Sequence, residues 1–313
     1  MICYEYPLVS ICCVAFNHEK YIEEAIQGFL NQKVDFLCEI LIHDDASTDH
    51  TANIIRKYQN EYPEIIKPIY QQENQYSQGR KVSSILFHEA KGKYIAWCEG
   101  DDYWTNPNKL QKQVDFLEKN PNYDLCLHNI LWVWEDENRQ PEGREKNPKD
   151  TYTLEAHLNP DERATVGHTS TAVFKRYLVK NLPKWFYDSV YEDVPLFAYI
   201  GGFGLTKYIN EVMAVHRIHK DSLSSREKSL DFYINKLRMY TAIDHHYKKK
   251  YHHLLKNKIS DYYEKVIFRY RDDLPKTQLI SLFIKAILNN PSLSNPIIQA
   301  VNQKIASKLS FTK

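Results

Sequence analysis

Apolar, β-branched runs alternate along the first half of the chain with segments whose apolar residues recur at helical spacing. The run from Val9 to Ala15 is typical of a buried strand, and the segment after it predicts a helix from about His18 to Asn31. Further strands are expected at residues 39–43, 65–70, 94–98 and 123–134, with helices between them. This order predicts βαβ units and therefore an α/β fold with a mostly parallel central sheet.

The second half of the chain is less regular. Residues 135–150 are almost wholly polar, which predicts an exposed loop, and further strands are expected at 169–174 and 207–216 around a helix that begins near Asp188. After Ser225 the spacing is helical to the end, with breaks at three prolines, Pro275, Pro291 and Pro296. We therefore expect an α/β domain over residues 1–222 and a helical C-terminal extension over residues 223–313.

Composition predicts the cell compartment, because the segments that would direct the chain into or across a membrane are not found. With 313 residues and 43% hydrophobic content the chain can bury a large core, yet no stretch approaches the roughly 20 apolar residues that span a bilayer. The first residues lack the layout of a signal peptide, so a cytoplasmic protein is expected. Five of the six cysteines lie in or beside apolar runs and no CxxC pair occurs, which favours reduced cysteines over disulfides or zinc ligands.

Charge is distributed unevenly along the chain. Residues 221–313 hold 17 Lys and Arg against 8 Asp and Glu, a net charge of +9, whereas the rest holds 24 against 32, a net charge of −8. A basic tail could contact an anionic membrane surface, a phosphate-bearing acceptor or nucleic acid, although a solvated helical face is the usual explanation. Within it, Leu279 to Leu288 could lie on a membrane surface as an amphipathic helix, or pack on the first domain.

Acidic residues follow two of the predicted parallel strands, and a third strand ends beside them. Asp44 and Asp45 follow the second strand, and Glu99-Gly100-Asp101-Asp102 follows the fourth. Carboxyl ends of parallel strands share one edge of the sheet, so these acids should converge there. Such carboxylates suit Mg²⁺ or Mn²⁺ with substrate phosphates completing the shell. The alternative is that Asp101 and Asp102 cap a helix; the preceding buried strand and the aromatic pair after them favour the cation site.

Four segments resemble, in order and spacing, the signature blocks of the family 2 glycosyltransferases: VSICCVAFNHEKYIEEAIQGFLNQ, EILIHDDASTDHTANII, AKGKYIAWCEGDDYWTNPNKL and YEDVPLFAYI. Together they cover most of residues 7–220. The resemblance implies a GT-A fold for the first domain. It also implies inverting transfer of a sugar from a nucleotide-sugar, most often a UDP-sugar, with Mn²⁺ or Mg²⁺. The acceptor would be a hydroxyl of a glycan or lipid-linked molecule in cell-surface polysaccharide synthesis.

Residues of this chain that match donor-binding positions of that family are expected to bind the nucleotide-sugar. By resemblance, Val14 and Phe16 would line the base pocket, with Phe16 stacking on the uracil where the family more often has Tyr. Asp45 would accept the N3–H of the uracil. Asp101 matches the acid that approaches the ribose or the metal, and Asp102 matches the one that coordinates the metal.

One departure from the family concerns the diphosphate. Relatives usually have an Arg-Asn pair in the helix before the fourth strand, whereas this chain has Val-Ser-Ser at 82–84. Arg80 or Lys81 could supply the missing cation, or be ordinary exposed loop charges. Near the end of the last strand, the alternation in VHRIH puts Arg217 and His219 on one side, as a candidate pair for phosphate or metal. Gly167 to Ser170 aligns loosely with a segment near the acceptor site.

The acceptor half of the site is matched by Glu192 and Asp193. The resemblance makes Asp193 the general base that takes the proton of the acceptor hydroxyl, with Glu192 orienting the acceptor. The alternative is that both are first-turn acids favoured by a helix dipole. A rival function, a non-catalytic nucleotide- or nucleic-acid-binding protein, would explain the basic tail. It leaves the acidic strand ends without a purpose, so we expect no nucleic acid partner.

Overall fold

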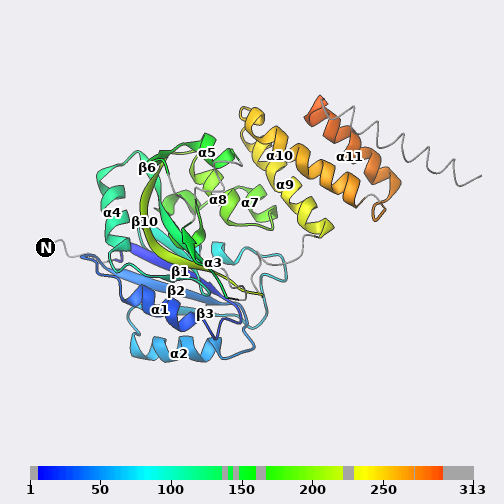
Figure 1. Ribbon diagram of the computed structural model, residues 1–313. Helices are drawn as coiled ribbons and strands as arrows, with labels where there is room; N and C mark the ends of the chain where they lie inside the picture. The colour runs from blue at the N-terminus through cyan, green and yellow to red at the C-terminus, as the bar shows by residue number, and fades with distance from the viewer. Residues whose placement is uncertain are drawn as a thin grey trace, which may run out of the picture. The chain divides into compact units, whose positions relative to one another are not determined.

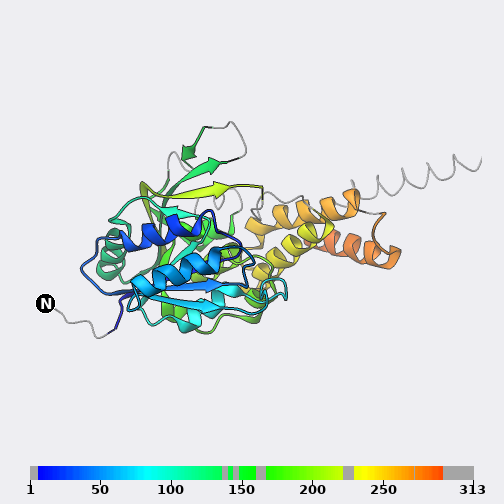
Figure 2. The same cartoon turned by 90° about the horizontal axis from the view of Figure 1, so that it is seen from below.

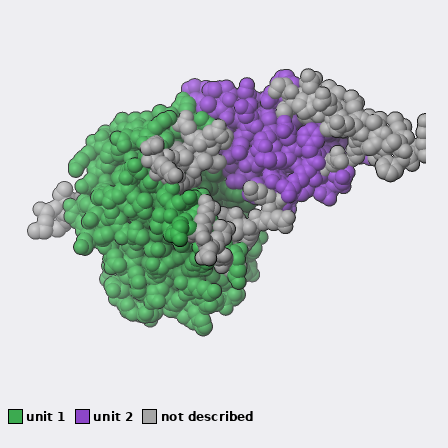
Figure 3. All heavy atoms as spheres, in the orientation of Figure 1, with its two compact units in different colours: residues 1–226 green, residues 227–313 purple. Residues whose placement is uncertain are grey.

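The computed structural model describes residues 6–135, 140–143, 148–159, 167–220, 229–270 and 272–291. The chain divides into two compact units, residues 1–226 and residues 227–313, shown in separate colours in Figure 3. The change in composition had placed the boundary at residue 222. Each unit is described by itself below.

A mixed sheet forms the centre of the first unit, in the order β3-β2-β1-β4-β9-β6-β10-β5 (Figure 1). Strands β3, β2, β1 and β4 are parallel, β9 is antiparallel to both of its neighbours, and β10 is parallel to β6. This confirms the predicted α/β class with a mostly parallel sheet. The strands are β1 (Val9–Ala15), β2 (Cys38–Asp44), β3 (Ile66–Tyr70), β4 (Tyr94–Glu99), β5 (Tyr103–Trp104), β6 (Tyr123–Trp134), β7 (Glu142–Gly143), β8 (Thr151–Tyr152), β9 (Val173–Lys175) and β10 (Leu205–Ile218).

Helices cover both faces of the sheet. The first unit has α1 (Ile22–Leu30), α2 (Thr51–Glu61), α3 (Val82–Glu89), α4 (Lys109–Lys119), α5 (Leu154–Leu158), α7 (Lys184–Asp188) and α8 (Asp193–Ile200). Successive strand residues point to opposite faces, so Ile11 joins the core under α1, α2 and α4, and Cys12 joins the one under α3, α7 and α8. Figure 2 shows α1 and α2 side by side on their face. The described cysteines are free thiols.

Most predicted elements of the first unit are present, and the strand predicted at residues 169–174 was wrong in its first half. There the chain forms a 3₁₀ turn, η1 (Thr169–Thr171), before β9 begins. The imidazole of His168 accepts a hydrogen bond from the backbone of Ser170, and the hydroxyl of Thr171 accepts one from the backbone of His168. This reciprocal cap stabilises a turn where β-branched residues alone predicted a strand.

The second unit is helical, as the spacing after Ser225 predicted. It contains α9 (Leu230–His246), α10 (His252–Glu264), a π-helical continuation η4 (Lys265–Arg269) and α11 (Lys276–Asn289). Pro275 directly precedes α11, whereas the break between α9 and α10, where Lys248 and Lys249 have positive φ angles, carried no proline to predict it. The predicted break at Pro296 lies outside the described residues. None of the helices in the described ranges is long and apolar enough to cross a membrane.

Candidate functional site

The ends of β1, β2 and β4 meet at one edge of the sheet, as predicted. Ala15 pairs with Asp44, and Val14 pairs with both His43 and Glu99, so the three loops that follow begin at the same level. Asn17, at a positive φ of 55°, ties two of these loops together: its side-chain oxygen accepts from the backbone of Thr48 at 2.8 Å. The site is therefore built on interlocked loops.

Asp45 is buried and engaged by the protein itself. Its two carboxylate oxygens accept hydrogen bonds from the backbone N–H groups of Gln75 at 2.8 Å and Tyr76 at 3.0 Å, and His43 Nε2 lies 3.3 Å away. A carboxylate with two backbone donors and an imidazole already around it holds a loop in place. Its predicted contact with the uracil stays a prediction.

The neighbouring Asp44 differs from Asp45. Within the described ranges its Oδ1 is buried and has no hydrogen-bond partner. Burial raises the pKa of Asp44, and contacts with Ser47 oppose that shift. Asp44 thus has a vacant acceptor at the strand end, which the sequence analysis did not use. The alternation of side chains along β2 could have predicted that Asp44 and Asp45 have different surroundings, because consecutive residues of a strand point to opposite sides.

Phe16 and Val14 stand where a base could lie. The Phe16 side chain is 41% exposed although it directly follows a buried strand, and Val14 is partly buried at the same edge. The exposed Phe16 ring offers a stacking surface for a planar heterocycle at the end of β1, the strand that pairs with the one carrying Asp44.

Asp102 meets two histidines from distant parts of the chain. Its Oδ1 lies 3.0 Å from His216 Nδ1 on β10, and its Oδ2 lies 3.5 Å from His168 Nδ1, beside η1. One ligand atom from each of the three residues falls within 4.8 Å of the others. Asp102 is fully buried, and its Oδ2 has no hydrogen-bond partner in the described part of the chain. One carboxylate and two imidazoles facing one point fit a divalent cation.

Asp101 belongs to a second acid–histidine group. Its Oδ2 lies 3.3 Å from His219 Nε2 and 3.9 Å from His18 Nε2. Burial alone would raise the pKa of Asp101, but the hydrogen bond with His219 and the charge of His18 lower it. The structure thus divides the predicted metal ligands: Asp101 and His219 pair with each other, while Asp102 faces His216, which the sequence analysis had placed on the other side of the strand from His219.

Arg217 is held by the protein's own groups. Only 8% exposed, it donates to the backbone oxygen of Asp101 at 2.7 Å and forms an ion pair with Glu24. Its guanidinium also lies over the rings of Tyr21 and Tyr103. The predicted contact with phosphate stays a prediction, and these contacts assign Arg217 to fixing the acid loop against α1.

The acid loop after β4 is tightly packed and strongly negative. A Cβ on Gly100 would lie 2.9 Å from His18 Nδ1, which explains the glycine between the acids. Burial, followed by the charges of Asp101, Asp102, Asp193 and Glu192, raises the pKa of Glu99 well above its ordinary value. Carboxylates from β4 and from α8 thus share one site, and a cation would offset their repulsion.

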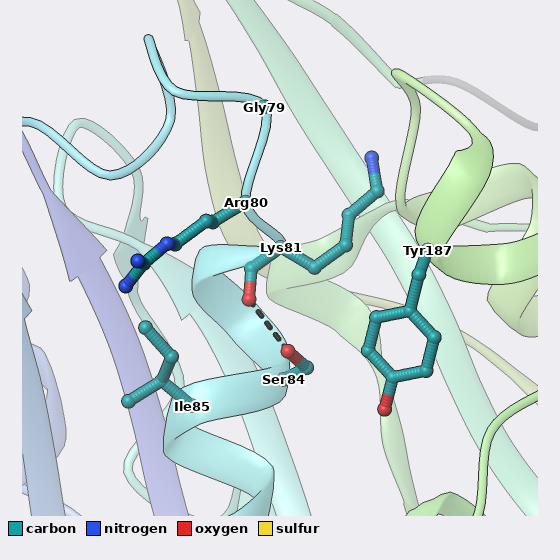
Figure 4. A pocket seen from close by; sticks show the side chains of 6 residues that line it. All are labelled: Gly79, Arg80, Lys81, Ser84, Ile85 and Tyr187. Carbon is teal, nitrogen blue, oxygen red and sulfur yellow. Dashed lines mark hydrogen bonds between the residues drawn. The ribbon is translucent and has the colours of Figure 1, made fainter. Parts of the chain in front are cut away.

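Glu192 and Asp193 stand at the start of α8. Burial raises the pKa of Glu192, and hydrogen bonds with Ser83 together with the charge of Lys81 oppose that shift. Arg80 and Lys81, which precede α3, line a cavity of about 370 Å³ (Figure 4). The predicted catalytic acids and the predicted cations therefore occupy neighbouring positions.

Comparison with known proteins gives a consistent result. The model of the family described as glycosyl transferase family 2 matches residues 10–182. An uncharacterized protein of Mycobacterium tuberculosis is 43% identical over 130 residues, 41% of this chain and 36% of that protein. The Escherichia coli protein named UDP-Glc:alpha-D-GlcNAc-diphosphoundecaprenol beta-1,3-glucosyltransferase WfaP is 36% identical over 112 residues, 36% of this chain and 41% of that protein. The matches thus span well under half of these relatives.

Solved structures share the fold over nearly the whole chain. TarS of S. aureus, in complex with UDP-GlcNAc, aligns with a TM-score of 0.60 at 20% identity over 93% of this chain and 92% of that one. The mannosyltransferase PcManGT of Pyrobaculum calidifontis, in complex with GDP-Man and Mn²⁺, aligns with a TM-score of 0.55 at 17% identity over 99% and 89%. The predicted GT-A fold is confirmed.

Proposed function

The chain belongs to glycosyl transferase family 2, and from this premise we propose that it is an inverting enzyme acting on a nucleotide-sugar, in the first place a UDP-sugar. The acceptor is a hydroxyl of a glycan or lipid-linked molecule in cytoplasmic steps of cell-surface polysaccharide synthesis. The observation that carries the proposal is the convergence of Asp102, His168 and His216 beside the carboxylates of β4 and α8.

Mn²⁺ fits the acid–histidine group better than Mg²⁺. Asp102 would hold it together with His216 and His168, because two imidazoles in the shell suit a softer ion than Mg²⁺, which prefers oxygen ligands. A bound cation would supply charge neutralisation for the leaving diphosphate. The buried Oδ2 of Asp102, which has no hydrogen-bond partner among the described residues and lies 3.5 Å from His168 Nδ1, supports this assignment.

The donor base occupies the ends of β1 and β2. Phe16 stacks on the uracil, Val14 lines the pocket, and Asp44 accepts the N3–H through its vacant oxygen. In this arrangement Asp45, the residue first expected to bind the base, holds the loop at Gln75 and Tyr76. Asp101 and its partner His219 lie beside the ribose.

Asp193 acts as the general base. As the acceptor oxygen attacks the anomeric carbon, its proton moves to the Asp193 carboxylate, and the bond from that carbon to the diphosphate oxygen breaks. Glu192, which directly precedes Asp193 at the start of α8, positions the acceptor for this step.

Titration calorimetry with UDP tests the donor half. We expect binding that requires Mn²⁺ and that is lost in Asp102→Asn, because removing the ligand charge weakens the metal site. Asp193→Asn should keep UDP binding and abolish transfer. Metal-independent UDP binding in the wild type, or turnover by Asp193→Asn equal to that of the wild type, would refute the corresponding assignment.

The basic tail supports a peripheral contact with the inner face of the membrane. On α11, Ile280, Ile284 and Leu288 are 59%, 54% and 77% exposed at successive turns, and Lys276 and Lys285 flank this stripe. The basic loop at 248–250 lies next to the end of α11, since His252 contacts the backbone oxygen of Asn289 at 3.1 Å. Co-sedimentation with phosphatidylglycerol vesicles, reduced by Ile284→Glu, is expected; no sedimentation of the wild type would exclude the contact.

A further inference from the structure

A cavity of about 370 Å³ lies between the start of α3 and the helix α7. Its lining residues are Gly79, Arg80, Lys81, Ser84, Ile85 and Tyr187. Figure 4 shows that the Lys81 side chain extends toward the α7 side, above the Tyr187 ring, whereas Arg80 extends the opposite way. The cavity thus presents one cation and one aromatic ring from two elements far apart in the sequence.

Lys81 is buried without a partner of its own. The residue is only 6% exposed. No described residue lies within hydrogen-bond or ion-pair distance of its ammonium group. Arg80, in contrast, donates to Gln75 Oε1 at 2.7 Å. The ammonium lines the open cavity rather than being fully enclosed, so a ligand anion that enters the cavity can pair with it and offset the cost of its partial burial.

The surroundings of Lys81 place this anion on the acceptor side of the site. The acid whose charge acts on Lys81 is Glu192, which is adjacent in sequence to the proposed base Asp193. The opposite charges that act on Asp101 and Asp102 come instead from histidines, His18 and His216. Lys81 therefore lies with the groups that meet the acceptor rather than with those that hold the donor diphosphate.

Tyr187 completes the case for a sugar ligand. Its side chain is 44% exposed at the cavity, and an accessible aromatic ring offers a flat apolar face to the C–H face of a pyranose. We propose that this cavity binds an acidic group of the acceptor, a phosphate or a carboxylate next to a pyranose ring, through Lys81 and Tyr187. The inference rests on the proposed function and deepens it, since it makes the enzyme selective for anionic acceptors.

The experiment measures binding of small acceptor probes by NMR titration, with saturating UDP and Mn²⁺ present. The probes are N-acetylglucosamine 1-phosphate, glucuronic acid and neutral N-acetylglucosamine. We expect the wild type to bind at least one acidic probe about tenfold more tightly than the neutral sugar, as a charge-assisted hydrogen bond would give. Preference for the phosphate or for the carboxylate identifies the source of the charge, and either result supports the proposal.

The variants separate the acceptor from the donor. Lys81→Met keeps the volume of the chain, and it should remove the preference for acidic probes while leaving the UDP dissociation constant unchanged. Tyr187→Ala should weaken the binding of the acidic and the neutral probes alike. The control is Lys184→Met on the same helix α7, whose exposed ammonium pairs with Asp188 at 2.6 Å and which should behave as the wild type.

Two results would overturn the inference. One is equal binding of acidic and neutral probes by the wild type. The other is a loss of UDP affinity in Lys81→Met, which would assign the lysine to the donor diphosphate and leave the proposed glycosyl transfer intact. Absence of UDP binding by the wild type itself would instead refute the proposed function.

Discussion

Two Asp-Asp pairs follow parallel strands of the same sheet, and their surroundings differ. After β2, Asp45 accepts two backbone N–H groups and approaches His43, so its charge is balanced by the protein. After β4, Asp102 Oδ1 accepts from the backbone of Arg217 and approaches His216, whereas its Oδ2 approaches only His168, at 3.5 Å, and has no hydrogen-bond partner among the described residues. Burial raises the pKa of Asp102. The same Asp-Asp motif thus has two different roles. A carboxylate whose hydrogen-bonding capacity is filled by the protein fixes a loop, and one whose capacity is only partly filled can bind a ligand.

The largest expected effect is a loss of transfer activity when the Asp-Asp pair after β4 is changed. Asp102→Asn should lower transfer with Mn²⁺ by at least about a hundredfold, because it removes the only charged member of the acid–histidine group described above. It should not lower the free energy of unfolding, since it also relieves repulsion with Asp101 and Glu99. UDP release measured at several Mn²⁺ concentrations, with urea denaturation alongside, checks both parts. Near-normal turnover would remove Asp102 from the metal site.

The second expected effect is a loss of stability when Asp45, in the pair after β2, is changed. Asp45→Asn should reduce the free energy of unfolding by about 2–3 kcal/mol, because one amide oxygen cannot satisfy two buried backbone donors. Urea denaturation measures this loss, and Asp102→Asn is the matched control. An Asp45→Asn protein of wild-type stability that no longer binds UDP would instead support the first expectation, that Asp45 recognises the base.

A smaller effect concerns pH and Glu192, the acid that shares its site with the β4 loop. Its folded pKa is raised by burial above the ordinary value of about 4.5. Below that pH both states carry the proton; as pH rises, the unfolded chain ionises first, so stability is lost up to and through the folded pKa. Glu192→Gln cannot ionise and should melt at a higher temperature than the wild type at pH 8, with the difference vanishing near pH 4.5. A difference independent of pH would show that ionisation is not its cause.

The strand and helix pattern could be predicted because it depends on local periodicity. The strands at 9–15 and 123–134 have the predicted bounds, and the acids after β2 and β4 converge as parallel strands require. The identity of the partners could not be predicted, because it depends on contacts between distant segments. His168 reaches Asp102 only through the capped turn at η1, and the charge of Glu192 acts on Lys81 although the two residues are far apart in the sequence. Spacing along the chain carries no record of either contact.

The smallest expected effect tests whether the loop after β2 depends on its backbone conformation rather than on the side chain of Ala46. Ala46 has a φ of 62°, in the left-handed region where a Cβ is disfavoured by roughly 1–2 kcal/mol, and it directly follows Asp45. Ala46→Gly removes that strain but adds freedom to the unfolded chain, so we expect a net gain in the free energy of unfolding of about 0.5 kcal/mol. Urea denaturation measures it, and UDP affinity should stay unchanged because the backbone already holds the required conformation. If UDP affinity fell instead, the Cβ of Ala46 would have to contact the donor, and the loop after β2 would bind ligand together with Asp44 at the strand end.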